Sequence, residues 1–196
     1  TPLRIDADAL QARTRTAGAS VIALDDIDDL VIDGPGWATD VKLVPGGLRM
    51  AYEGLLQVRA QGSLTVEGLV EMSFDPRGGI VLQAVEGDLN FDGGSLIMGS
   101  GTLSLLAGGD ILQSGASSIT NPNSSREGRG SIDIEAGGRF VQEAQSRIAT
   151  RGSRAGDILI RAGADIIVSD IDAGLGGIGL VTDSGSVLEA PTLIHL

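Results

Sequence analysis

Residues 101–111 read GTLSLLAGGDI, residues 130–140 read GSIDIEAGGRF, and residues 156–166 read GDILIRAGADI. These three segments align without gaps, and GLLQVRAQGSL at 54–64 fits the same frame. Two more segments, GGIVLQAVEGDL at 78–89 and GGIGLVTDSGSV at 176–187, fit after one extra residue. Such self-similarity predicts a repeat architecture in which each unit packs only against its neighbours.

The aligned repeats place residues of one kind in four columns. The first column is Leu56, Ile80, Leu103, Ile132, Ile158 and Ile178, and the second is Val58, Leu82, Leu105, Ile134, Ile160 and Leu180. A column of small residues follows, Ala60, Ala84, Ala107, Ala136, Ala162 and Thr182, and then Leu64, Leu89, Ile111, Phe140, Ile166 and Val187. Apolar residues alternate with period two, which predicts strands. First-column intervals of 24, 23, 29, 26 and 20 residues indicate loops of different length on a constant cross-section.

A unit of about 24 residues with two or three short strands predicts one coil of a right-handed, single-stranded parallel β-helix. The Gly pairs 108–109 and 137–138, and the Gly-Ala pair 163–164, are expected to supply positive φ at the corner that follows the small column. A sandwich or barrel would need recurring Asn-Gly or Asp-Gly hairpin turns, and Asp33-Gly34 and Asp92-Gly93 do not recur at one repeat position. We expect one all-β segment over 1–196, with seven to eight coils and a length of about 35 Å.

Residues 1–53 fit this frame less regularly than residues 54–196. Apolar residues alternate twice between Ser20 and Asp33, which predicts a further coil there. Residues 34–53 predict an irregular coil or a side loop, because they hold two Pro-containing turns and the only Trp and Tyr. Residues 6–13 fit either a strand or a short N-terminal cap, and the pattern leaves both open.

Composition and charge exclude several classes of function. The chain has 14 basic and 26 acidic residues, a net charge of −12, which argues against nucleic acid or an anionic membrane as a partner. It has no Cys, so a disulfide scaffold, Cys-ligated zinc and thiol catalysis are excluded. No apolar run reaches the length of about 18 residues that predicts a membrane-inserted helix. The chain opens on TPLRID and stops on PTLIHL, which resembles the start of another strand, so we expect a fragment of a longer polypeptide.

The segment ALQARTRTAGASVIALDDIDDLVIDG at 9–34 is followed by recurring copies of the pattern G-S-I-x-I-x-A-G-G. This combination resembles the β-helical stalks of filamentous-haemagglutinin-type exoproteins, which are very large bacterial adhesins secreted across the outer membrane. The resemblance covers nearly the whole chain. It implies a structural or adhesive role outside the cell or at the outer-membrane surface. The partners implied are adjacent repeats of the same chain and a host surface, a neighbouring-cell surface or a polysaccharide.

Members of this family often carry an Asn-Pro-Asn motif in an N-terminal secretion domain. Here Asn121-Pro122-Asn123 lies mid-chain, within a polar insertion predicted over 120–129 that accounts for the longest repeat interval. We therefore interpret the motif as a turn.

A run of acidic residues is the candidate for a metal site. Calcium takes six to eight oxygen ligands, and Asp25, Asp26, Asp28 and Asp29 could supply several. Neither the EF-hand pattern nor the glycine-rich calcium nonapeptide is complete in this sequence. The alternative interpretation is a solvated outer edge that disfavours aggregation. No other cofactor is implied.

Some parallel β-helices are enzymes that act on pectin, and they need carboxylates grouped on an outer face. One outward position recurs just before the second strand of each coil, and it is occupied by Ser63, Asp88, Asp110, Arg139, Asp165 and Ser186. This row predicts either a catalytic site or a charge-balanced stack in which Arg139 offsets Asp110 and Asp165. The only histidine, His195, has no identifiable partner, and no G-x-S-x-G motif is present.

The sequence favours a structural or adhesive stalk segment without catalytic residues of its own. A pectin-lyase-like polysaccharide enzyme or a carbohydrate-binding module is the alternative. A calcium-stiffened surface module is the second alternative.

Overall fold

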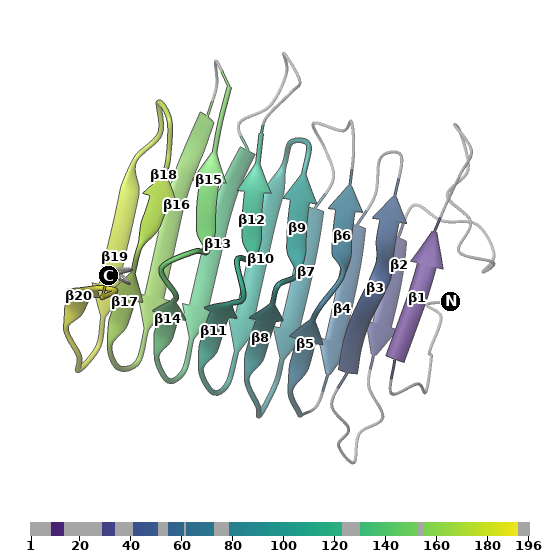
Figure 1. Ribbon diagram of the computed structural model, residues 1–196, viewed down its shortest axis with the longest axis horizontal. Coiled ribbons are helices and arrows are strands. Elements are labelled where there is room, and N and C mark those ends of the chain that lie inside the picture. Colours follow the sequence, from purple (N-terminus) through teal and green to yellow (C-terminus); the bar gives the residue numbers. More distant parts are fainter. Residues whose placement is uncertain are drawn as a thin grey trace, which may run out of the picture.

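The computed structural model describes residues 9–13, 29–33, 41–50, 55–60, 62–72, 79–122, 130–152 and 155–191. Within these ranges the regular elements are all β-strands, and none is a helix. Strands of successive turns lie side by side along the long axis of the molecule, from β1 at one end to β19 and β20 at the other (Figure 1). Every strand pairing is parallel. The predicted all-β parallel solenoid is therefore confirmed.

The strands form three faces. The first face is a seven-stranded sheet of β2 (Asp29–Asp33), β4 (Leu55–Ala60), β7 (Gly79–Ala84), β10 (Thr102–Ala107), β13 (Gly130–Ala136), β16 (Ala155–Ala162) and β19 (Ile178–Thr182). The second face holds β5 (Leu64–Val66), β8 (Leu89–Asp92), β11 (Ile111–Ser114), β14 (Phe140–Gln142), β17 (Ile166–Val168) and β20 (Val187–Glu189). The third face holds β6 (Leu69–Met72), β9 (Ser95–Met98), β12 (Ser118–Asn121), β15 (Arg147–Thr150) and β18 (Asp170–Asp172).

One long strand connects the second and third faces at the N-terminal end of the described chain. Strand β3 (Val41–Met50) pairs with β5 through residues 41–43 and with β6 through residues 48–50. It also pairs with β1 (Ala9–Arg13). The strands from β4 to β18 then make five complete turns, each with one strand on every face.

The four predicted columns are confirmed in every pairing. Ile134 in β13, for example, lies in register with Leu105 on one side and with Ile160 on the other. The column residues between Leu56 and Ile166 are buried, so the core runs unbroken through the five turns. Each buried aliphatic side chain contributes about 1.5–3 kcal/mol relative to an exposed one, which makes these columns the main source of stability.

A fifth apolar column lies on the third face and was not predicted from the sequence. Its members are Val70, Leu96, Ile119, Ile148 and Ile171, in register from β6 to β18. The extra coil predicted between Ser20 and Asp33 is supported in its second half, because Leu30 and Ile32 lie in register with Leu56 and Val58. Its first half lies outside the described residues.

The prediction of positive φ at the paired glycines is wrong. The described glycines with positive φ are Gly93, Gly101, Gly115, Gly152 and Gly174, none of them in a Gly pair after the small column. The paired glycines instead allow close contact between turns. A Cβ at Gly108 or Gly137 would overlap the carbonyl oxygen of Val85 or Gly108 in the preceding turn.

Two boundary predictions also need correction. Residues 41–50 are a strand, β3, and not part of an irregular coil or side loop, because each half of the strand pairs with its own neighbour. The insertion begins later than residue 120, since Thr120 and Asn121 belong to β12. Residues 9–13 are the strand β1, which settles the open choice for this part of the 6–13 stretch.

Candidate functional site

The outward row predicted before the second strand exists, and hydrogen bonds join its members. We call these residues the corner ladder: Ser63, Asp88, Asp110, Arg139, Asp165 and Ser186. In most steps the side chain of one turn accepts the backbone N–H of the next. The N–H of Asp88 donates to the Oγ of Ser63 at 3.1 Å, and the N–H of Asp110 donates to the Oδ1 of Asp88 at 2.8 Å. The N–H of Arg139 donates to the Oδ1 of Asp110 at 2.7 Å. The N–H of Ser186 donates to the Oδ1 of Asp165 at 2.8 Å.

A glycine precedes each ladder residue that lies above such an oxygen. A Cβ at Gly109 would overlap the Oδ1 of Asp88, and one at Gly138 would overlap the Oδ1 of Asp110. In the turn that follows Arg139, the residue just before the ladder residue Asp165 is Ala164 and not a glycine. Arg139 carries no carboxylate to cap the backbone above it, so a methyl group fits there. The second glycine of each pair therefore makes room for the carboxylate of the turn below.

Arg139 and Asp110 also form an ion pair. The Nε and Nη2 atoms of Arg139 lie 3.1 and 2.7 Å from the Oδ2 of Asp110. Partial burial raises the pKa of Asp110, but the backbone N–H and the guanidinium of Arg139 outweigh it and hold that pKa below the ordinary 3.8. The hydrogen bonds that the Arg139 guanidinium donates to Asp110, and the negative charge of that carboxylate, raise the pKa of Arg139.

The hydrogen bonds of the corner ladder join neighbouring turns. A general acid or base must exchange a proton near the working pH. Asp110 is held in its ionised form, and its two oxygens are occupied by the backbone and side chain of Arg139. Of the two interpretations of this row, the geometry favours the charge-balanced stack.

A second set of ion pairs lies on the outer side of the third face. The Nη2 atom of Arg147 lies 2.9 Å from the Oδ2 of Asp172, and its Nη1 lies 3.6 Å from the Oδ2 of Asp170. The Nε of Arg151 lies 3.8 Å from Asp172. The backbone N–H of Gly174 lowers the pKa of Asp172, and the nearby Arg147 and Arg151 act in the same direction. These exposed pairs join neighbouring turns, and each contributes about 0–1 kcal/mol.

Two buried glutamines were missed by the sequence analysis. Gln113 and Gln142 occupy an inward column in which they follow Val66 and Phe91 in register. The Nε2 of Gln142 donates to the carbonyl oxygens of Ser146 and Asp170, and its Oε1 accepts the N–H of Ser169 at 2.8 Å. Both glutamines thus satisfy backbone groups at the corner between the second and third faces.

The Gln113 amide repeats this role one turn earlier, donating through Nε2 to the carbonyl oxygens of Ser117 and Arg147 at 3.2 and 2.9 Å. The sequence signal is a Gln at the same position of two consecutive repeats, each followed four residues later by Ser. The corners of these two turns are extended compared with the short corner at 67–68.

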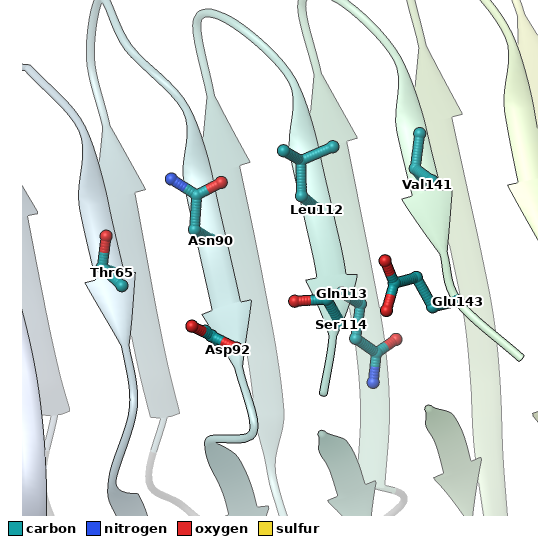
Figure 2. Close-up of a pocket in the computed structure, with 8 residues that line it drawn as sticks. All are labelled: Thr65, Asn90, Asp92, Leu112, Gln113, Ser114, Val141 and Glu143. Carbon is teal, nitrogen blue, oxygen red and sulfur yellow. The ribbon is translucent and has the colours of Figure 1, made fainter. Parts of the chain in front are cut away.

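A groove of about 430 Å³ lies on the outer side of the second face, lined by Thr65, Asn90, Asp92, Leu112, Gln113, Ser114, Val141 and Glu143. Figure 2 shows two rows of these side chains across neighbouring strands. Thr65, Asn90, Leu112 and Val141 form one row, and Ser114 lies between Asp92 and Glu143 in the other. A second hollow of about 520 Å³ shares Val141 and Glu143 with the groove and continues toward Ile167, Ala190 and Pro191.

The side chains of the predicted calcium ligands lie outside what the structure describes. Asp25, Asp26 and Asp28 lie outside the described residues, and only the backbone of Asp29 is described, in β2. Elsewhere among those residues, no three His, Asp or Glu side chains form a group that could hold a metal ion. His195 also lies outside the described ranges.

The first residue of the Asn-Pro-Asn motif is in a strand and not in a turn. Asn121 ends β12 and is buried, and its Nδ2 donates to the carbonyl oxygen of Gly101 at 3.0 Å. Pro122 is exposed, and Asn123 lies outside the described residues. No described helix has the length and apolar character needed to cross a membrane.

No protein-family model matches the chain, and comparison with curated proteins and with solved structures gives no match either.

Proposed function

We propose that this chain is a rigid structural or adhesive stalk segment of a large secreted or surface-exposed bacterial protein. One observation carries the proposal: five apolar columns continue in register through five turns while loops and corners vary around them. A cross-section that stays constant makes a rod whose length grows by about 4.8 Å per turn. Such a rod suits the display of loops at a distance from an anchor.

The finer parts of this proposal go beyond the five complete turns described. We propose a right-handed path and seven to eight coils over the whole chain. We further propose that the protein belongs with the filamentous-haemagglutinin-type exoproteins, because the repeat pattern at 130–140 resembles theirs. Its partners would then be adjacent repeats and a host surface, a neighbouring-cell surface or a polysaccharide, outside the cell.

An in-register deletion tests the stalk. Removing residues 79–101 joins Gly78 to Thr102, which takes the place of Gly79 in the pairing register. The shortened chain should fold, with a melting temperature close to the wild-type value, and small-angle scattering should report a rod shorter by about 4.8 Å. The control removes residues 82–103, which leaves Ser104 as an extra residue inside the joined strand, where no loop can absorb it. Leu105 and the residues after it then point to the opposite face, which should prevent folding.

A stalk also requires that the chain itself leaves polysaccharides intact. Incubation with neutral, acidic and amino-bearing polysaccharides should release no reducing ends or unsaturated products. Turnover that survives purification would overturn the proposal, as would an in-register deletion that unfolds the chain as completely as its control.

A carbohydrate-binding module is the second candidate, and the groove at Asp92, Ser114 and Glu143 favours it.

The alternative of a calcium-stiffened module is supported only by the acidic run at 25–29. Calorimetric titration with calcium tests that alternative directly, since a saturable heat that Asp25→Asn and Asp28→Asn abolish would establish it.

A further inference from the structure

The groove on the second face has an apolar floor that continues from turn to turn. Leu112, Val141 and Ile167 point outward from β11, β14 and β17 and lie in register. All three side chains are half-buried. The floor crosses the strands and therefore runs along the axis of the rod. A ligand that fills it must be extended and must lie parallel to that axis.

The charged groups at the edge of the groove are two carboxylates, and both lack cationic partners. In the described residues Asp92 and Glu143 are exposed, and neither forms an ion pair. Asp110, Asp133 and Asp172 do form such pairs, with Arg139, Arg161 and Arg147 respectively. No Lys, Arg or His lines either part of the groove. The charge of the groove therefore suits a cationic ligand and disfavours an acidic polysaccharide.

The distance along the rod between the carboxylates of Asp92 and Glu143 sets a repeat length that a ligand must match. Asp92 lies in register with Ser114, and Glu143 follows at the same position one turn later. Two turns separate Asp92 from Glu143, which is about 10 Å along the rod. In a β-1,4-linked hexosamine chain, alternate sugars face the same way, so amino groups on one side recur once per disaccharide. That repeat is close in length to two turns of the rod.

Recognition here must rely on side chains. The backbone groups of β8, β11 and β14 are engaged in parallel pairing on both sides, so a peptide cannot add to this face as a further strand. A glycan carries donors and acceptors along its whole length and needs no strand pairing. Asn90 and Ser114 can exchange hydrogen bonds with hydroxyl groups between the two carboxylates.

We propose that this groove binds an extended amino-bearing glycan, with Asp92 and Glu143 each contacting an ammonium group and the Leu112–Val141–Ile167 row contacting the apolar faces of the sugar rings. This binding role goes beyond the stalk and does not depend on it, because a rod can carry such a site whatever its other duties. The ligand lies along the rod axis and spans at least two turns.

Calorimetric titration with the β-1,4-linked glucosamine hexasaccharide tests the proposal. The fully N-acetylated hexasaccharide and a hexagalacturonate serve as neutral and acidic probes of the same length, and hexalysine serves as a non-glycan cation. We expect binding of the glucosamine oligomer, at least about tenfold weaker binding of the N-acetylated one, and none of the hexagalacturonate. The double variant Asp92→Asn with Glu143→Gln should weaken glucosamine binding by about tenfold or more.

Matched variants separate the groove from the general negative charge of the rod. The pair Asp133→Asn with Glu135→Gln changes the same number of charges on the first face and should leave the affinity within about twofold of wild type. Val141→Arg should abolish binding, whereas Val81→Arg, at an outward position of β7, should not. The proposal is overturned by equal affinity for the N-acetylated oligomer or for hexalysine, by equal effects of the two charge pairs, or by the absence of binding to folded protein.

Discussion

Gly138→Ala tests whether the corner glycines make room for the carboxylates of the corner ladder. A Cβ at Gly138 would overlap the Oδ1 of Asp110. That oxygen accepts the N–H of Arg139 at 2.7 Å. The carboxylate must move, and it loses this bond and its ion pair with the Arg139 guanidinium. A hydrogen bond to a charged group contributes about 1.5–3 kcal/mol, and an exposed ion pair contributes about 0–1 kcal/mol. Gly138→Ala should therefore lower the free energy of unfolding by about 2–4 kcal/mol.

Gly177→Ala is the matched control. Its N–H also donates to a carboxylate, the Oδ1 of Asp157, at 2.7 Å. A Cβ there would lie 3.4 Å from that oxygen, which is an ordinary contact. The bond therefore survives, and the loss of chain entropy in the unfolded state should make Gly177→Ala neutral or stabilising by up to about 1 kcal/mol.

Urea denaturation followed by far-UV circular dichroism measures both variants and also a double-mutant cycle. Asp110→Ala removes the atom that the new Cβ would meet, so Gly138→Ala should lose most of its effect on the free energy of unfolding in that background. Equal destabilisation by Gly138→Ala and Gly177→Ala would refute the reasoning. Strict additivity of Gly138→Ala and Asp110→Ala would refute it as well.

Three further results are expected. Ile134→Asp should abolish the folded signal in circular dichroism, because it buries a charge without a partner, whereas outward Glu135→Ala should change the free energy of unfolding by less than about 0.5 kcal/mol. Gln142→Leu should cost about 2–4 kcal/mol in urea denaturation, since the carbonyl oxygens of Ser146 and Asp170 and the N–H of Ser169 lose this partner at a partly buried corner. The folded-state pKa of Asp110 is lowered, so its stabilising effect is complete well above pH 3.8 and disappears as the pH falls through the folded-state value. Asp110→Asn should remove that part of the acid dependence in a pH series of melting curves.

The four buried columns could be predicted because the period-two alternation of apolar residues and the alignment of the repeats identify the same residues. Leu105, Ile134 and Ile160 align in the sequence, and the same residues align in space. The third face was harder to predict. Its strands have three or four residues, and corners of different length precede them, so Val70, Leu96 and Ile119 follow the fourth column by six, seven and eight residues and share no single spacing. Buried glutamines also interrupt the apolar pattern just before these corners.

The corner ladder shows what a residue pattern in the sequence can predict and what it cannot. Its members were found by their position in the repeat, but the choice between catalysis and packing depended on what each carboxylate touches. The bond from the Arg139 N–H to Asp110 is possible only because position 138 lacks a Cβ. The groove was not predictable, since it depends on outward residues such as Leu112 and on the corners beside them.

The adjacent glutamines Gln113 and Gln142 make the order of the turns matter. A solenoid of purely aliphatic columns would accept its turns in any sequence, since each layer offers the same surface to the next. Here the amide of Gln113 bonds to the carbonyl oxygen of Arg147 in the following turn, and that of Gln142 bonds to the carbonyl oxygen of Asp170 in the turn after that. Exchanging the turn of β7–β9 with that of β13–β15 would reverse the order of the two glutamine layers and break this series of bonds. Recombination between repeats is therefore permitted only where it keeps the glutamine turns adjacent and in this order, so these turns have fixed neighbours.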